Sequence, residues 1–245
     1  THRTDYAGEM LTMLYAILDA DLVTSSSRQL QSYLAEINPN SKFIPNYLND
    51  KLWVLKDQQP ASDLDSGITI GYMGGQTHTA DLESIKTSLL NVYNKYSKQV
   101  NFKFWGTRPP PELLEISSTT WYQIDQENYA KFAEYFSQQE CDIFIAPLQD
   151  NLFNRCKSNI KFLEYSALGV PGVYSRINPY ADVVEDGVNG YLASSPGEWQ
   201  RNLIKLIEDP SLRTRMGQEA QSTVRANWLL SKHLREWSDF YGNLP

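Results

Sequence analysis

The sequence contains little cysteine and little histidine for its 245 residues. The two cysteines, Cys141 and Cys156, are too few for a disulfide framework. His2, His78 and His233 lie far apart along the chain, and no Cys/His cluster has the spacing of a zinc site. The sequence therefore predicts neither a disulfide-stabilised fold nor a bound metal.

An excess of basic charge and long apolar runs are also lacking. The net charge is −7, which argues against a general nucleic-acid binder, because contacts to the phosphate backbone need a basic face. Apolar runs such as "IFIAPL" are too short to cross a bilayer, and no signal peptide is recognisable. We expect a folded cytoplasmic protein with no nucleic-acid partner and at most peripheral membrane association. Because the chain begins at Thr1, within helical sequence, we also expect a piece of a longer protein.

The sequence does contain a regular alternation of strand-like and helix-like segments. The apolar segment "GITIGYM" is followed by a helical stripe that includes Leu82, Ile85 and Leu89, and then by the strand-like "VNFKFWG". Strands that are apolar on both faces are typical of sheets covered by helices on both sides. We therefore predict an α/β fold with a doubly wound parallel sheet. The alternating segments are 67–73, 80–98, 100–106, 128–139, 141–148, 158–169, 170–175 and 185–193.

The two ends of the chain differ from this central part. Within the first 50 residues, the short apolar segments "LVTSS" and "KFIPN" flank a helical pattern, which predicts a β-α-β unit. Residues 56–67, "KDQQPASDLDSG", are polar and contain one Pro and one Gly, so they are interpreted as a linker. The tail from 197 onwards consists of helical segments that are interrupted at Pro210 and near Trp228.

A pair of glycines follows the first predicted strand of the central part. In an open parallel sheet, ligands bind at the carboxyl ends of the strands. Gly74 and Gly75 lie between a strand and a helix, where backbone N–H groups can approach a phosphate. The stretch matches neither GxGxxG nor a Walker A loop, and such a turn is often only a turn. His78 is interpreted as a surface residue at the helix start, unless a bound ligand lies above it.

The segment "KSNIKFLEYSALGVPGV" carries two lysines and one acid at a helix start. Ser158 is the predicted N-cap, which places Lys161 at the third helical position. Lysines there oppose the helix dipole, at a cost of roughly 0.3–1 kcal/mol each, so a bound diphosphate would explain Lys157 and Lys161. Glu164 lies one turn further on the same face and can accept hydrogen bonds from ribose hydroxyls. The alternative is a simple Lys–Glu pair that stabilises the helix by a few tenths of a kcal/mol.

At this point the sequence resembles a known family. "KSNIKFLEYSALGVPGV", followed by "VVEDGVNGYLA", is similar to the C-terminal donor-binding domain of GT-B glycosyltransferases of the retaining group 1 family. Members typically show a Lys-x-x-Glu-Ala-x-Ala-x-Gly-x-Pro-Val-Val helix and strand, and then Glu-Asp-Gly-x-Asn-Gly. The segments at 157–173 and 184–192 are fairly specific, and the strand order elsewhere is generic for α/β proteins.

The resemblance implies a division of the chain. Residues 1–55 are the end of an N-terminal acceptor domain that is otherwise missing, and 56–67 are the linker. Residues 68–226 form the Rossmann-like domain that binds a nucleotide sugar. Residues 227–245 form a C-terminal helix that packs back on the N-terminal segment.

The resemblance also implies the chemistry, which is transfer of a sugar from a nucleotide-diphosphate sugar with retained configuration and without a metal or other cofactor. Lys161 matches the lysine near the donor phosphates and Glu164 the glutamate on the donor ribose, so these two are the implied catalytic residues. The acceptor is an unknown glycan, lipid or protein. Further implied donor contacts are Gly74, Gly75, His78, Gln123, Ile124, Asn154, Lys157, Ser158 and Asn159.

Two departures from the family pattern concern the transferred sugar and the phosphates. Eight residues before Glu164 the family usually has a second acid that contacts the sugar, but this chain has Cys156, with Asn154 and Asp150 as nearby substitutes. The basic residues that usually follow the first strand of the domain are replaced by "QTHTAD", so His78 is the candidate to take over their role.

A third departure lies after the last core strand. "INPYADVV" stands where the family has Gly-Gly-x-x-Glu, with Arg176 and Tyr180 as candidate contacts. Three hypotheses follow. The first is the donor-binding half of a glycosyltransferase, the second a non-catalytic scaffold or interaction domain with the same fold, and the third a sugar-nucleotide epimerase.

Overall fold

The computed structural model describes residues 6–56, 62–124 and 128–242. Parts of the predicted N-terminal segment, linker and C-terminal helix, at 1–5, 57–61 and 243–245, therefore lie outside the described residues. The strands are β1 (Val23–Ser25), β2 (Ser41–Phe43), β3 (Ile68–Gly74), β4 (Val100–Gly106), β5 (Thr119–Tyr122), β6 (Ile143–Ala146), β7 (Gly172–Ser175) and β8 (Tyr191–Ala193). The helices are α1 (Tyr6–Asp19), α2 (Arg28–Ile37), α3 (Thr79–Tyr96), α4 (Pro111–Leu114), α5 (Tyr129–Ser137), α6 (Leu152–Arg155), α7 (Ile160–Ala167), α8 (Pro196–Glu208), α9 (Pro210–Asn227) and α10 (Leu230–Gly242), with short 3₁₀ turns η1 (Gln76–His78) and η2 (Ser97–Gln99).

The centre of the molecule is a parallel sheet of six strands in the order β5-β4-β3-β6-β7-β8. Ile70 of β3 is paired with Phe102 of β4 on one side and with Ile143 of β6 on the other. The chain thus builds outwards from β3 in one direction and then returns to build from β6 in the other. This reversal is the topological switch point, where open α/β sheets bind ligands at the carboxyl ends of the strands. The predicted doubly wound α/β fold is confirmed.

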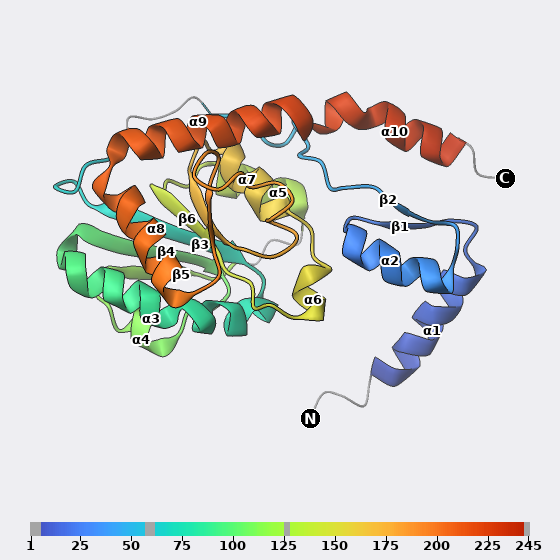
Figure 1. Ribbon diagram of the computed structural model, residues 1–245, viewed down its shortest axis with the longest axis horizontal. Helices are drawn as coiled ribbons and strands as arrows, with labels where there is room; N and C mark the ends of the chain where they lie inside the picture. Colours follow the sequence, from blue (N-terminus) through green and yellow to red (C-terminus); the bar gives the residue numbers. More distant parts are fainter. Residues whose placement is uncertain (1–5, 57–61, 125–127, 243–245) are drawn as a thin grey trace.

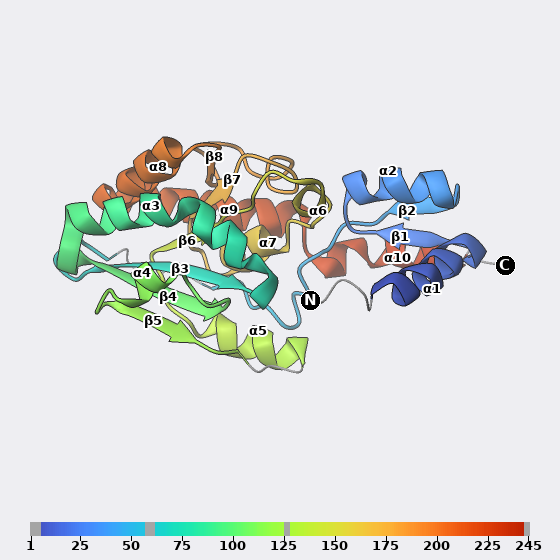
Figure 2. The ribbon, with the colours of Figure 1, turned by 90° about the horizontal axis from the view of Figure 1, so that it is seen from below.

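Helices cover both faces of the sheet, as Figure 2 shows for α3 and α8 on one side and α5 on the other. Alternate residues of β3 divide between these faces. Ile70 and Tyr72 pack in the apolar cluster that includes residues of α3 and α8, whereas Met73 packs in the cluster that includes residues of α5, α7 and α9. Phe104 and Trp105 of β4 divide in the same way. Burial on both faces explains why these strands have few polar residues.

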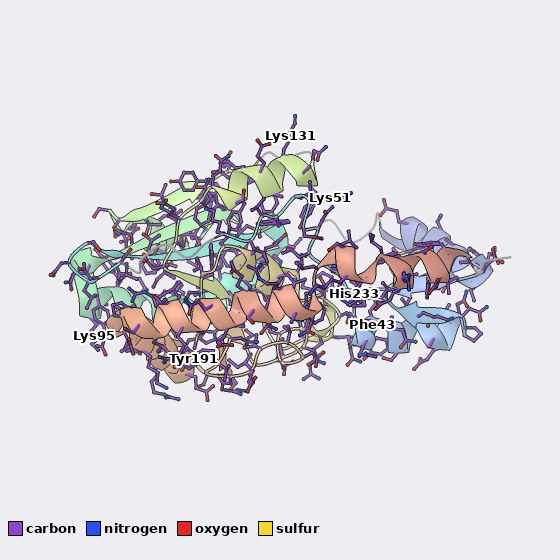
Figure 3. All side chains as sticks on the ribbon, turned by 90° about the horizontal axis from the view of Figure 1, so that it is seen from above. Phe43, Lys51, Lys95, Lys131, Tyr191 and His233 are labelled. Carbon is purple, nitrogen blue, oxygen red and sulfur yellow. The ribbon has the colours of Figure 1, made fainter. Side chains whose placement is uncertain are left out.

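The N-terminal unit, defined here as α1, β1, α2 and β2, forms a separate parallel pair of strands. Figure 1 shows α9 along the α/β body and α10 continuing over the N-terminal unit, and Figure 3 labels His233 on α10 and Phe43 on β2. The ring of His233 stacks on Tyr47 at 3.9 Å, and the Tyr47 hydroxyl donates to Glu236 at 2.6 Å. The tail helix is therefore in direct contact with the chain that follows β2. The domain boundaries themselves stay a prediction.

Three local features differ from the sequence-based expectations. Strand β5 was not expected from the sequence, because it is only four residues long and lies in a polar stretch. It pairs with β4 and forms the edge of the sheet. The short helices α4 and α6, of four residues each, also lack a recognisable period. The N-cap of α7 is Asn159 and not Ser158, so Lys161 is the second helical residue rather than the third. Within the described residues, no helix is both long enough and apolar enough to span a membrane.

Candidate functional site

The glycine loop lies at the carboxyl end of β3, beside the end of β4. Gly106 has a φ of +82°, and a Cβ at this position would lie 2.3 Å from the carbonyl oxygen of Gly74. Thr107 holds the loop from the other side, because its backbone N–H donates to the Gly74 oxygen at 2.7 Å. A Cβ on Gly75, in contrast, would meet no atom within 4 Å. Gly75 therefore faces open space, as a loop that receives a ligand must.

A groove of about 450 Å³ opens next to this loop. Gly74 and Gly75 line it together with Gln123 and Ile124, the two residues predicted to be near a base. Trp121 of β5 and Phe132 of α5 add aromatic surface to the same groove. The predicted glycines and Ile124 are thus brought together. The other predicted residues do not line this groove: His78 ends the 3₁₀ turn after Gly75, Asn154 is in α6, and Lys157, Ser158, Asn159, Lys161 and Glu164 lie just before or within α7.

His78 is buried and not a surface residue, which corrects the first interpretation of this position. Its exposed fraction is 7%, and its Nδ1 lies 2.8 Å from Oδ2 of Asp81 in the first turn of α3. Asp81 is 3% exposed, and its Oδ1 accepts hydrogen bonds from the backbone N–H of Gln149 and from Nδ2 of Asn154, both at 2.8 Å. Burial alone disfavours the charge on Asp81, but the hydrogen bonds outweigh it and lower the pKa of this carboxyl.

Both predicted lysines converge on the His78 ring. Nζ of Lys161 lies 3.3 Å from Nε2, and Nζ of Lys157 lies 3.3 Å from Nδ1 and 3.9 Å from Oδ2 of Asp81. An ammonium group can only donate, so Nε2 accepts from Lys161, and Nδ1 carries the proton that it donates to Asp81. Burial lowers the pKa of His78, the hydrogen bond with Asp81 opposes this, and the two nearby lysines lower it further, so that the net shift is below the usual value. The ring is therefore neutral at pH 7.

Glu164 points into the protein and not into bulk water. It is 3% exposed, and its Oε1 accepts a hydrogen bond of 2.9 Å from the hydroxyl of Tyr129 at the start of α5. The Tyr129 hydroxyl in turn accepts a hydrogen bond from Nε1 of Trp53 at 3.1 Å. Tyr129 at the start of α5 thus holds the carboxylate, and Trp53 holds Tyr129. Burial raises the pKa of Glu164 to about 7 and lowers that of Lys161 to about 8, while the attraction between the two charges opposes both shifts.

Tyr165, the residue after Glu164, hydrogen-bonds helix α7 to strand β3 just before the glycine pair. The hydroxyl of Tyr165 accepts from the backbone N–H of Met73 at 3.1 Å and lies 3.2 Å from the Met73 oxygen. Asn159 is buried at the start of the helix and, within the described residues, makes no side-chain capping bond. The hydroxyl of Ser158 instead accepts from Nδ2 of Asn46 at 2.8 Å, which joins this turn to the segment after β2.

Two of the suggested contacts, Asp150 and Arg176, form exposed ion pairs outside the group around His78. Asp150 is exposed and forms a two-pronged pair with Arg155, so it does not join the cluster. Arg176 pairs with Asp186 at 2.5 Å near the far edge of the sheet. Tyr180 is buried against Tyr174, and burial, together with the nearby charges of Asp81 and Glu164, raises the pKa of its hydroxyl. Cys156 is the C-cap of the short helix α6.

Sequence reasoning missed Asp81, Tyr129 and Trp53. The spacing of His78 and Asp81, three residues apart across a helix start, is a local signal that could have revealed the first. Tyr129 lies 35 residues from Glu164 and Trp53 lies 76 residues from Tyr129, and no local pattern marks those pairs.

Two comparisons by sequence identify related proteins. The sequence model of the family described as "Glycosyl transferases group 1" matches residues 122–223. A curated relative, the uncharacterized glycosyltransferase MJ1069 of Methanocaldococcus jannaschii, is 37% identical over 65 residues, which are 26% of this chain and 17% of the relative.

Two solved structures resemble nearly the whole chain. A sucrose-phosphate synthase from Thermosynechococcus elongatus aligns with a TM-score of 0.69 and 15% identity, over 99% of this chain and 64% of that one. Anabaena Alr3699/HepE, solved in complex with UDP-glucose, aligns with a TM-score of 0.72 and 14% identity, over 97% and 68%. The chain thus spans about two thirds of these proteins. The predicted resemblance to the C-terminal domain of GT-B, group 1 glycosyltransferases is confirmed, in sequence over residues 122–223 and in fold over nearly the whole chain.

Proposed function

We propose that this chain binds a nucleotide-diphosphate sugar at the carboxyl ends of β3 and β4, as the donor half of a retaining glycosyltransferase. The observation that carries the proposal is the convergence of Lys157 and Lys161 on the ring of His78, three residues after the open position of Gly75, with Glu164 one turn beyond Lys161 on α7. In the absence of an anion this arrangement is electrostatically costly, because two ammonium groups share one buried imidazole.

The diphosphate would lie between the ammonium groups of Lys157 and Lys161, the start of α7 and the glycine loop. The two ammonium groups and the first amides of α7 provide donors, and the loop at Gly74 and Gly75 allows close approach of a phosphate without side-chain obstruction. The helix dipole, which opposes the two lysines, attracts the same anion. A bound diphosphate would therefore relieve the repulsion between Lys157 and Lys161.

The nucleoside extends from there into the groove. Glu164 is the one acid on α7, and a carboxylate can accept hydrogen bonds from both hydroxyls of a ribose. The base would lie near Gln123 and Ile124, where the groove has aromatic walls. Support comes from Anabaena Alr3699/HepE, whose structure contains UDP-glucose on the same fold. UDP-glucose is therefore the first donor to test.

During transfer, the nucleoside diphosphate departs with increasing negative charge. Lys161, assisted by Lys157, stabilises this charge, which is the preorganised electrostatic role that lowers the barrier. No side-chain nucleophile is needed in this scheme. The acceptor, a glycan, lipid or protein, would be bound with the help of an N-terminal acceptor domain, and a cytoplasmic location stays a prediction.

Binding is tested by isothermal titration of the chain with UDP-glucose, GDP-glucose and ADP-glucose. Saturable binding of one of them, with competition by the corresponding nucleoside diphosphate, supports the proposal. The absence of binding for all three at several millimolar would contradict it. In the presence of a competent acceptor, retention is checked by NMR of the anomeric proton of the product.

One observation favours a second candidate, a nucleotide-sugar-binding domain without catalysis. Cys156 replaces the acid that contacts the transferred sugar in the family pattern, and the nearby amide of Asn154 is bonded to Asp81 and to the Gln149 oxygen. Binding of the donor without release of the sugar to any acceptor, by the full-length protein, would support this candidate. Turnover by the full-length protein would exclude it.

A further inference from the structure

The imidazole of His78 lies at the centre of the charges described above. Four groups face it from four segments: Asp81 on α3, Lys157 before α7, Lys161 on α7, and the ring of Tyr72 on β3, whose centroid is 6.4 Å away. In the free protein the ring has to stay neutral, because Nε2 must accept a hydrogen bond from the Lys161 ammonium. Two positive charges and one negative charge therefore surround a neutral ring.

A bound diphosphate would favour the protonated form of His78. Its oxygens compete for the ammonium groups of Lys157 and Lys161, so Nε2 of His78 loses the donor that it accepts in the free protein. At the same time the anion brings negative charge close to the ring, which favours the imidazolium form. Protonated Nε2 then has an acceptor, because a phosphate oxygen replaces the ammonium as its neighbour.

We propose that binding of the nucleotide-diphosphate donor is coupled to uptake of one proton by Nε2 of His78, which makes His78 a third cationic donor to the diphosphate. This inference rests on the proposed function. The proton comes from the solvent, no covalent bond changes, and the net positive charge of the site increases by one when the anion arrives. His78 thereby takes the place of the basic residues that the family pattern has after this strand.

Asp81 is a positioning residue for this step. Its hydrogen bonds from Gln149 and Asn154 hold the carboxylate in place, and its Oδ2 keeps the proton of His78 on Nδ1. The basic site Nε2 is therefore directed towards the lysines. When the ring gains its second proton, Asp81 carries the charge that compensates it. Replacing Asp81 by Asn should reduce the proton uptake and leave the ring neutral in the complex.

The coupling is measured by titration with UDP-glucose, or with whichever sugar nucleotide binds, at pH 7.5 in buffers of different ionisation enthalpy. The slope of the observed enthalpy against the buffer enthalpy is the number of protons taken up, and we expect about one. A sugar nucleotide is the right probe because both of its phosphates are esterified. A free nucleoside diphosphate has a terminal phosphate with a pKa of about 6, and its own protonation change would add to the measured proton number.

The variant that isolates His78 is His78→Asn, whose amide can still donate to Asp81 but cannot titrate. We expect its slope to be lower than that of the wild type by about one proton, while His233→Asn, on α10, keeps the wild-type slope. Glu164 and Lys161 can also exchange protons on binding, and the difference between wild type and His78→Asn removes their contribution. An unchanged slope in His78→Asn, or a slope of zero in the wild type, would overturn the inference. The absence of any binding would instead overturn the proposed function.

A direct measurement does not depend on the folding of a variant. The chain has only three histidines, so ring ¹⁵N shifts of the wild-type protein can be resolved and assigned. We expect the neutral Nδ1–H form of His78 in the free protein and the doubly protonated form in the complex at the same pH. A neutral ring in both states would contradict the coupling. Between the pKa of His78 in the free protein and its higher pKa in the complex, donor affinity should fall about tenfold per pH unit, and above the pKa of the complex it should no longer depend on this group.

Discussion

The hydroxyl of Tyr129 and the carboxylate of Glu164 are joined by a hydrogen bond of 2.9 Å that links α5 to α7. Tyr129 is 47% exposed while Glu164 is 3% exposed, so the phenol is the contact between the buried acid and the surface. The bond lowers the pKa of Glu164, against the larger effect of burial. It thus keeps more of the carboxylate ionised, as the proposed contact with a ribose requires.

Tyr129→Phe tests this relationship. Removing the hydroxyl should raise the pKa of Glu164 further, so donor affinity falls about 3- to 10-fold at pH 7, which corresponds to about 0.5–1.5 kcal/mol for one hydrogen bond. The loss should be greater at pH 6 than at pH 8, because protonation removes the acceptor. Binding titrations across this range measure it. Tyr135→Phe on the same helix is the control, and tighter binding by Tyr129→Phe would contradict the prediction.

Glu164→Ala tests the ribose contact. We expect the variant to lose about 1–3 kcal/mol of donor binding, because ribose hydroxyls are left without an acceptor. The sharper experiment compares UDP-glucose with its 2′-deoxyribose analogue in wild type and variant. The wild type should prefer the ribose form, and Glu164→Ala should lose that preference, as a double-mutant cycle requires. Glu134→Ala, an exposed acid on α5, should behave as wild type. Equal preference in both proteins would place the ribose elsewhere.

Two glycines should respond to alanine in opposite ways. Gly106→Ala forces a side chain into a φ of +82° and against the Gly74 oxygen, so the free energy of unfolding should fall by about 1–3 kcal/mol. Gly75 has a φ of −69° and open space around it, so Gly75→Ala should leave stability unchanged or raise it by about 0.4–1 kcal/mol.

Donor binding distinguishes the role of Gly75 from that of a simple turn. The methyl group of Gly75→Ala would occupy the space that the diphosphate needs, so donor affinity should fall roughly tenfold, or about 1.4 kcal/mol, in a protein that melts like wild type. Thermal unfolding and titration of the same sample measure both quantities. Unchanged affinity would show that the ligand does not approach this loop.

The buried acid also predicts a pH dependence of stability in the free protein. The pKa of Glu164 is raised from 4.5 to about 7, so between these pH values the folded state holds a proton that the unfolded state has released. The contribution of this group to stability is therefore largest at the acidic end and is lost as the pH rises to 7. The difference in free energy of unfolding between Glu164→Gln and wild type should therefore shift in favour of the variant by on the order of 2 kcal/mol when the pH rises from 5 to 7. Urea unfolding at several pH values measures this difference, and a constant difference would contradict the prediction.

The sequence by itself determined the parts of this protein that depend on near neighbours. The alternation of apolar strands with helical stripes, such as Leu82, Ile85 and Leu89, predicts the sheet because burial of a face repeats at fixed spacing along the chain. The placement of Lys161 and Glu164 one turn apart on one helix follows from the same regularity. The glycine pair at the end of β3 is likewise a local signal.

Only the tertiary structure decided which distant groups share one environment. Packing of α3 and α7 around the end of β3 brings Asp81, His78 and both lysines together, and docking of α5 supplies Tyr129 to Glu164. The N-cap of α7 is Asn159, while the Ser158 hydroxyl accepts a hydrogen bond from Asn46, which lies 112 residues away in the sequence. The charge on a buried group depends on the atoms that replace its water, and those atoms come from chain segments that no local pattern connects.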